Sequence, residues 1–135
     1  MKTVASGVLA LLVVVMAFVN SAQAAVSNPN PLNGTWSGQW HQSPNNGPIT
    51  LNIGPGGVVN GTVIGTEGDT ITLHGRVDRQ GHFTATLGQD DTGTCNGNIH
   101  KVTGHPNRIA GTIHVHSNSD GDFDVTVTAH KLATP

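Results

Sequence analysis

The segment Ile109–Ala129, IAGTIHVHSNSDGDFDVTVTA, contains the pattern that decides the fold. On each side of its centre, apolar and polar residues alternate, which is the two-residue period of a half-buried β-strand. Between the two runs, Ser119-Asp120-Gly121 supplies residue types that favour a tight turn. The segment therefore predicts an antiparallel hairpin in which Val115 faces Phe123 across the turn.

Six further runs between Gly34 and this hairpin show the same alternation. Their apolar positions are Trp36, Gly38 and Trp40; Ile49, Leu51 and Ile53; Val59, Gly61 and Val63; Ile71, Leu73, Gly75 and Val77; Phe83, Ala85 and Leu87; and Cys95, Gly97 and Ile99. The connections between runs are short and contain Gly, Pro and Asp, whereas parallel strands would need a crossover of about a dozen residues or more. We therefore expect eight strands in an antiparallel meander, with a turn at residues 104–107 among the connections.

The expected fold is all-β, with this eight-stranded meander closed into a small barrel. An open sheet of eight strands would leave two unpaired edges and one uncovered apolar face. No run after residue 24 has a helical period, so no helix is expected to cover that face. Closure into an up-and-down barrel removes both problems. A β-sandwich is the alternative, because it shares the same strand pattern.

The first 24 residues have the features of a secretory signal peptide. A basic residue, Lys2, precedes the apolar stretch Val8–Val19, and Ala22-Gln23-Ala24 offers small residues for cleavage. The apolar stretch is short for a membrane span, which needs about 20 residues. We expect a secreted or periplasmic protein with no membrane association after cleavage. Residues 25–33, rich in Asn, Pro and Ser, are expected to form an extended arm, and residues 34–132 the barrel.

Charge and cysteine content exclude some classes of function. Of the six Lys and Arg residues, five remain after removal of Lys2, and they form no basic cluster. Nucleic acid is therefore not an expected partner, because its binding needs a basic surface. The single cysteine, Cys95, has no partner for an internal disulfide, so the sheet and core must hold the domain together. Cys95 is expected to be a small buried apolar residue.

The first strand resembles that of the calycin group, which includes the lipocalins and the avidin-like proteins. The resemblance rests on Gly34-Thr35-Trp36 at the start of a meandering eight-stranded barrel. It implies that Trp36 closes one end of the barrel and that a cation from the last strand stacks on its ring. Lys131 has the parity for this role. The chain contains no tyrosine, which argues against a biotin site of the avidin type, and it lacks the disulfides of lipocalins.

Five of the runs place a glycine on the apolar side, namely Gly38, Gly61, Gly75, Gly97 and Gly111. An eight-stranded barrel has room inside for packed side chains or for one small ligand. Inward glycines remove side-chain volume, which is compatible with a small apolar pocket that has Trp36, Trp40, Phe83 and Phe123 as its aromatic walls. In the alternative, the glycines let strands coil sharply against the aromatic rings, and the interior is filled.

The histidines supply a second candidate site on the polar faces of the strands. If Val115 faces Phe123, then His116 faces Asp122 and His114 faces Asp124. Imidazole and carboxylate together suit Zn²⁺ or another first-row metal. In the alternative, the four residues are ordinary cross-strand polar pairs without a metal.

The chain contains no nucleophile elbow, no His-Glu-x-x-His run and no phosphate loop, so no enzyme activity is expected. We expect an exported module that binds a small, mainly apolar ligand in or at the mouth of the barrel. One alternative is a protein-interaction module, such as a protease inhibitor that uses the N-terminal arm. Another is metal binding through the last hairpin. No cofactor is expected, apart from a zinc ion in that alternative.

Overall fold

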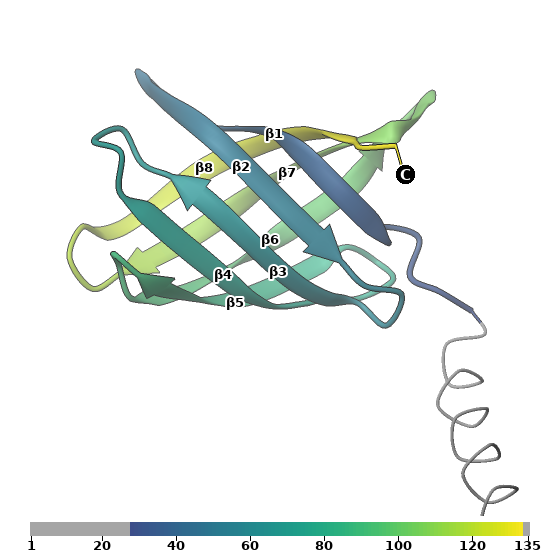
Figure 1. The fold of residues 1–135 in the computed structure, drawn as a ribbon, viewed down its shortest axis with the longest axis horizontal. Helices are drawn as coiled ribbons and strands as arrows, with labels where there is room; N and C mark the ends of the chain where they lie inside the picture. The colour runs from purple at the N-terminus through teal and green to yellow at the C-terminus, as the bar shows by residue number, and fades with distance from the viewer. Residues whose placement is uncertain (1–27, 134–135) are drawn as a thin grey trace, which may run out of the picture.

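Residues 28–133 are described in a computed structural model of the chain (Figure 1). The predicted signal peptide and residues 25–27 of the predicted arm lie outside the described residues. The eight strands form one closed antiparallel barrel in chain order, which confirms the predicted fold class. They are β1 (Gly34–Gln42), β2 (Asn45–Ile53), β3 (Val58–Ile64), β4 (Thr70–Val77), β5 (His82–Gln89), β6 (Gly93–Val102), β7 (His105–Ser117) and β8 (Gly121–Lys131).

The barrel closes because the first strand pairs with the last. β1 and β8 are antiparallel neighbours, in a register that runs from Trp36 opposite Lys131 to His41 opposite Thr126. This pairing excludes the sandwich alternative, and every strand has a hydrogen-bonded neighbour on both sides. The predicted hairpin register is also confirmed, with Val115 opposite Phe123.

The turn between β6 and β7 comes earlier than the sequence predicts. Pro106 and Asn107 were expected in this turn, but they belong to β7, which begins at His105. The chain reverses instead at Thr103 and Gly104, and Gly104 has a φ of +80° that suits glycine. The prediction relied on Pro106 as a turn residue. A register shift between Lys101 and Val102 accompanies the proline in this outer part of the β6–β7 pair.

Two of the inward glycines allow neighbouring strands to approach closely. A β-carbon added at Gly38 would lie 1.9 Å from the carbonyl oxygen of Thr128, and one added at Gly75 would lie 1.9 Å from that of Thr84. Both glycines face an alanine on the neighbouring strand, Ala129 and Ala85 respectively. Small residues on both strands therefore let the sheet coil tightly at these points.

The two ends of the barrel differ. We call the end where β1 begins the plugged end; it holds the connections 54–57, 78–81 and 103–104. The other end, which we call the open end, holds the connections 43–44, 65–69, 90–92 and 118–120. Because a meander reverses direction at every turn, alternate connections lie at the same end of the barrel.

The described part of the predicted arm, residues 28–33, is packed against the plugged end. The backbone N–H of Asn30 donates to the Pro55 carbonyl at 2.8 Å, and its side-chain amide donates to the Val77 carbonyl at 2.9 Å. Arg79 donates to the carbonyls of Asn28 and Pro29. Leu32 is buried and belongs to the hydrophobic core. This segment therefore covers the plugged end of the barrel.

Trp36 completes the closure. Its side chain is fully buried, at 0% exposure, and its indole N–H donates to the Leu32 carbonyl at 2.8 Å. The ammonium nitrogen of Lys131 lies 5.8 Å from the centre of the Trp36 ring. The predicted stacking of a cation from the last strand on this tryptophan is therefore confirmed, at a distance within the range of cation–π contacts.

Replacing Gly75 with alanine should destabilise the barrel. The added methyl group meets backbone atoms of β5, so the strands must separate, at a cost of about 1–3 kcal/mol. Urea unfolding followed by circular dichroism measures the change. Gly56→Ala is the matched control, because a β-carbon there has no atom within 4 Å. Equal unfolding midpoints for the two variants would contradict the proposed role of the close strand approach.

Candidate functional site

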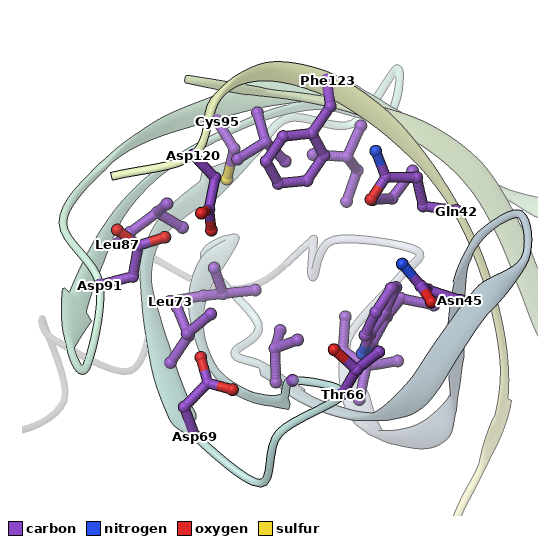
Figure 2. A pocket seen from close by; sticks show the side chains of 18 of the residues that line it. Gln42, Asn45, Thr66, Asp69, Leu73, Leu87, Asp91, Cys95, Asp120 and Phe123 are labelled. Carbon is purple, nitrogen blue, oxygen red and sulfur yellow. The ribbon is translucent and has the colours of Figure 1, made fainter. Parts of the chain in front are cut away.

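The open end of the barrel contains a cavity with a volume of about 530 Å³ (Figure 2). Its wall is formed by inward-facing apolar side chains from all eight strands. They are Trp40, Ile49, Val63, Ile71, Leu73, Leu87, Cys95, Ile113, Val115, Phe123, Val125 and Val127. The interior is thus filled at the plugged end and hollow at the open end.

Trp40 is positioned in the cavity wall by a hydrogen bond and by the absence of a side chain at its neighbour, Gly47. Its indole N–H donates to the Ile64 carbonyl at 2.9 Å, which ties β1 to the end of β3. Its cross-strand neighbour is Gly47, where an added β-carbon would lie 2.7 Å from the indole nitrogen. The missing side chain at Gly47 therefore leaves room for the ring. Phe123, at the start of β8, is half-buried and lines the same cavity.

The four predicted aromatic wall residues are divided between the two parts of the barrel. Trp40 and Phe123 line the cavity, whereas Trp36 and Phe83 do not. Trp36 packs at the plugged end, and Phe83, at 1% exposure, lies in the filled core opposite Gly97 and Val77. All four share the inward face of their strands, but they lie at different heights along the barrel axis.

Polar side chains surround the mouth of the cavity. In Figure 2, the carboxylates of Asp69, Asp91 and Asp120 lie on one side of the opening, and Gln42 and Asn45 lie on the other. Glu67, Thr66 and Asp122 also line the cavity. Of the described residues that line it, none is Lys, Arg or His. The cavity therefore combines an apolar wall with an acidic mouth.

Asp91 has a structural part in this mouth. It is buried, and its carboxylate accepts hydrogen bonds from the hydroxyls of Ser117 at 2.7 Å and Ser119 at 3.0 Å. Its own connection, between β5 and β6, is thereby joined to the connection between β7 and β8. These hydrogen bonds satisfy the buried carboxylate and hold one side of the opening in place.

Sequence reasoning identified Asp122, as a candidate metal ligand, but none of the other polar mouth residues. Most of these lie in or beside the connections, where single Asp and Asn residues are typical of turns and carry no motif. The order of the connections could have indicated these residues. In a meander, the third, fifth and seventh connections lie at the same end of the barrel, and here they are residues 65–69, 90–92 and 118–120. Glu67, Asp69, Asp91 and Asp120 all occur in these three connections.

The predicted histidine and aspartate pairs form on the outer face of the last hairpin. The Nδ1 atom of His116 lies 3.0 Å from Oδ1 of Asp122, and His114 pairs with Asp124 in the same way. The two imidazole rings meet edge to face, with their centres 4.5 Å apart. One potential ligand atom each from His114, His116 and Asp122 lie within 4.8 Å of one another. This geometry can hold a divalent metal ion.

Within residues 28–133, no helix is long and apolar enough to cross a membrane. No protein-family model matches the chain, and no curated protein is significantly similar to it. The closed eight-stranded antiparallel barrel is compatible with a calycin-like fold.

Cys95 should react slowly with alkylating reagents in the folded protein. It is 3% exposed and lines the cavity, and its burial raises the pKa of the thiol to about 11. At about pH 8, its thiolate fraction is on the order of 100-fold below that of an ordinary cysteine. Mass spectrometry after iodoacetamide treatment measures the rate, with the urea-unfolded protein as the control. Equal rates in the two states would contradict the buried position.

Proposed function

We propose that this protein is an exported, non-enzymatic, calycin-like module that binds a small, mainly apolar ligand in the cavity at the open end. The observation that carries the proposal is the cavity of about 530 Å³, with an apolar wall, in an otherwise closed barrel. Protein interiors normally contain few voids larger than a water molecule. Ligand sites are typically apolar concave spaces of about 300–1,000 Å³, and this cavity has a matching size and lining.

The arrangement favours entry through the open end. Leu32 and Trp36 close the opposite end, so an apolar molecule that enters passes the polar mouth first and then meets the apolar wall. Trp40 and Phe123 offer it aromatic surfaces. Burial of apolar surface then stabilises the complex by roughly 25 cal/mol for each Å² removed from water. Export is also a proposal, and it rests on the signal-peptide features of residues 1–24.

Filling the cavity should abolish the binding of a neutral apolar probe. N-phenyl-1-naphthylamine is suitable, because its fluorescence rises in an apolar environment. Val63 lines the cavity on β3, so Val63→Phe should weaken probe binding by about tenfold or more through lost volume. A fluorescence titration of wild type and variant measures the dissociation constants.

Val58→Phe is the matched control for this titration. Val58 lies on the same strand but is exposed, so the same substitution there leaves the cavity volume unchanged. Circular dichroism of both variants establishes that the barrel is intact. Wild-type probe binding in a folded Val63→Phe protein, or no probe binding by the wild type, would contradict the proposal.

A second candidate function is metal binding through the last hairpin, favoured by the short distances among His114, His116 and Asp122. Histidine nitrogen and carboxylate oxygen are common Zn²⁺ ligands, and two histidines with one carboxylate form a known ligand set. Asp124 is hydrogen-bonded to Nδ1 of His114, which would orient that ring toward a metal. The cavity and this cluster share Asp122, so the two candidate sites adjoin.

Calorimetric titration with Zn²⁺ tests the second candidate. The wild type should release or absorb heat with one ion per chain, and His114→Ala/His116→Ala should lose that signal because two of three ligands are removed. His100→Ala is the control, because His100 is an exposed histidine on the outer face of β6. Equal heats for wild type and the double variant would exclude a metal site on this hairpin.

The inhibitor alternative depends on the N-terminal arm. Residues 28–33 are engaged at the plugged end by hydrogen bonds and by burial of Leu32, so these residues do not favour it. Binding of a protease by this chain stays a prediction of the sequence pattern.

A further inference from the structure

Charged residues are separated along the barrel axis. Seven of the eight acidic residues lie at the open end, in the connections 65–69, 90–92 and 118–120 or at the start of β8. The exception is Asp78, in a connection at the plugged end. The described Lys and Arg residues, Arg76, Arg79, Lys101, Arg108 and Lys131, are all at the plugged half of the barrel. The protein is therefore negative around the cavity and positive at the opposite end.

At the mouth, the carboxylates of Asp69 and Asp120 have no partner that would neutralise their charge. Within residues 28–133, no hydrogen bond or ion pair involves the side-chain carboxylates of Asp69 and Asp120, whereas Asp91 accepts bonds from two serines. Both unpartnered carboxylates line the cavity, and Figure 2 shows them directed toward the opening. They come from different connections and are placed on one side of the mouth.

We infer that the ligand of the cavity is a cationic amphiphile, with an apolar body in the cavity and a protonated amine or quaternary ammonium group at the mouth. This inference rests on the proposed function, and it adds the charge of the ligand. A carboxylate or phosphate group at the mouth would meet Asp69, Asp120 and Glu67 with no basic side chain among the lining residues to offset the repulsion. An ammonium group gains an attraction from the same charges and stays hydrated at the opening.

The neutral side of the mouth is compatible with the same ligand. Gln42 and Asn45 lie across the opening from the carboxylates, and each side-chain amide offers a carbonyl oxygen as an acceptor. A protonated amine carries donors only, so every polar group that it meets at the mouth can accept a hydrogen bond from it. A quaternary ammonium group has no N–H and would be held at the mouth by its charge. The barrel's charge separation also attracts cations to the open end before they bind.

Three ligands of equal chain length and different charge test the inference. Nonylamine, 1-nonanol and nonanoate are cationic, neutral and anionic at about pH 7. Each is titrated against the complex with N-phenyl-1-naphthylamine, and displacement gives its dissociation constant. At an ionic strength of about 20 mM, we expect nonylamine to bind about tenfold more tightly than nonanol, and nonanoate to bind most weakly. The preference for the amine should shrink at about 500 mM salt, because salt screens the exposed charges.

Neutralising the mouth should remove the preference. Asp69→Asn/Asp120→Asn keeps the size of both side chains, so nonanol should bind as it does to the wild type while nonylamine loses most of its advantage. Asp78→Asn is the control, because it removes a negative charge at the plugged end and should leave the ratio of the two constants unchanged.

The outcomes separate the inference from the proposed function. If neither nonanol nor the fluorescent probe binds, the cavity is not a ligand site and the proposed function fails. If nonanol binds and nonylamine binds no more tightly, the cavity is a ligand site without charge selection and only the inference is overturned. An unchanged amine preference in the double variant would also overturn it.

Discussion

The hydrogen-bonded pairing of β1 with β8 is the interaction on which the rest of the molecule depends. It turns a meander with one exposed apolar face into a surface with an enclosed interior. The cavity follows from it, because the cavity exists only inside a closed barrel. The metal cluster is set by the pairing of β7 with β8 and lies on the outer face of the same barrel. The same pairing brings Lys131 beside Trp36, so the last strand helps to close the end at which the first strand begins.

The interior is divided into a packed half and a hollow half. Trp36 and Trp40 are on the same face of one strand, yet their surroundings differ. The indole N–H of Trp36 donates a hydrogen bond to the Leu32 carbonyl, and its ring is fully buried. The indole N–H of Trp40 donates to the Ile64 carbonyl, and its ring lines the cavity. The chain segment 28–33 accounts for much of this asymmetry, since it adds a buried leucine and a buried asparagine at one end only.

Much of the fold could be predicted from the residue pattern. Strand alternation indicated the inward and outward faces and, together with the turn at residues 119–121, the register of the last hairpin. The stacking of Lys131 on Trp36 was an implication of the calycin resemblance. The cavity was harder to place, because the inward glycines were compatible with a pocket and with tight coiling. Gly38 and Gly75 serve coiling, whereas Gly47, which the pattern did not single out, makes room for Trp40. The early turn at Thr103 and Gly104 also departed from expectation, because a proline was interpreted as a turn residue.

Periodicity by itself specified which side of the sheet each residue occupies, since successive side chains on a strand point to opposite faces whatever the neighbours are. The short connections between the runs specified that neighbouring strands are antiparallel. The height of each residue along the barrel axis was decided only by the folded structure, through strand register, coiling and the packing of residues 28–33. That height separates Trp36 and Phe83 from Trp40 and Phe123. It also gathers acidic residues from three distant connections around one opening, because closure brings together chain segments that no local pattern relates.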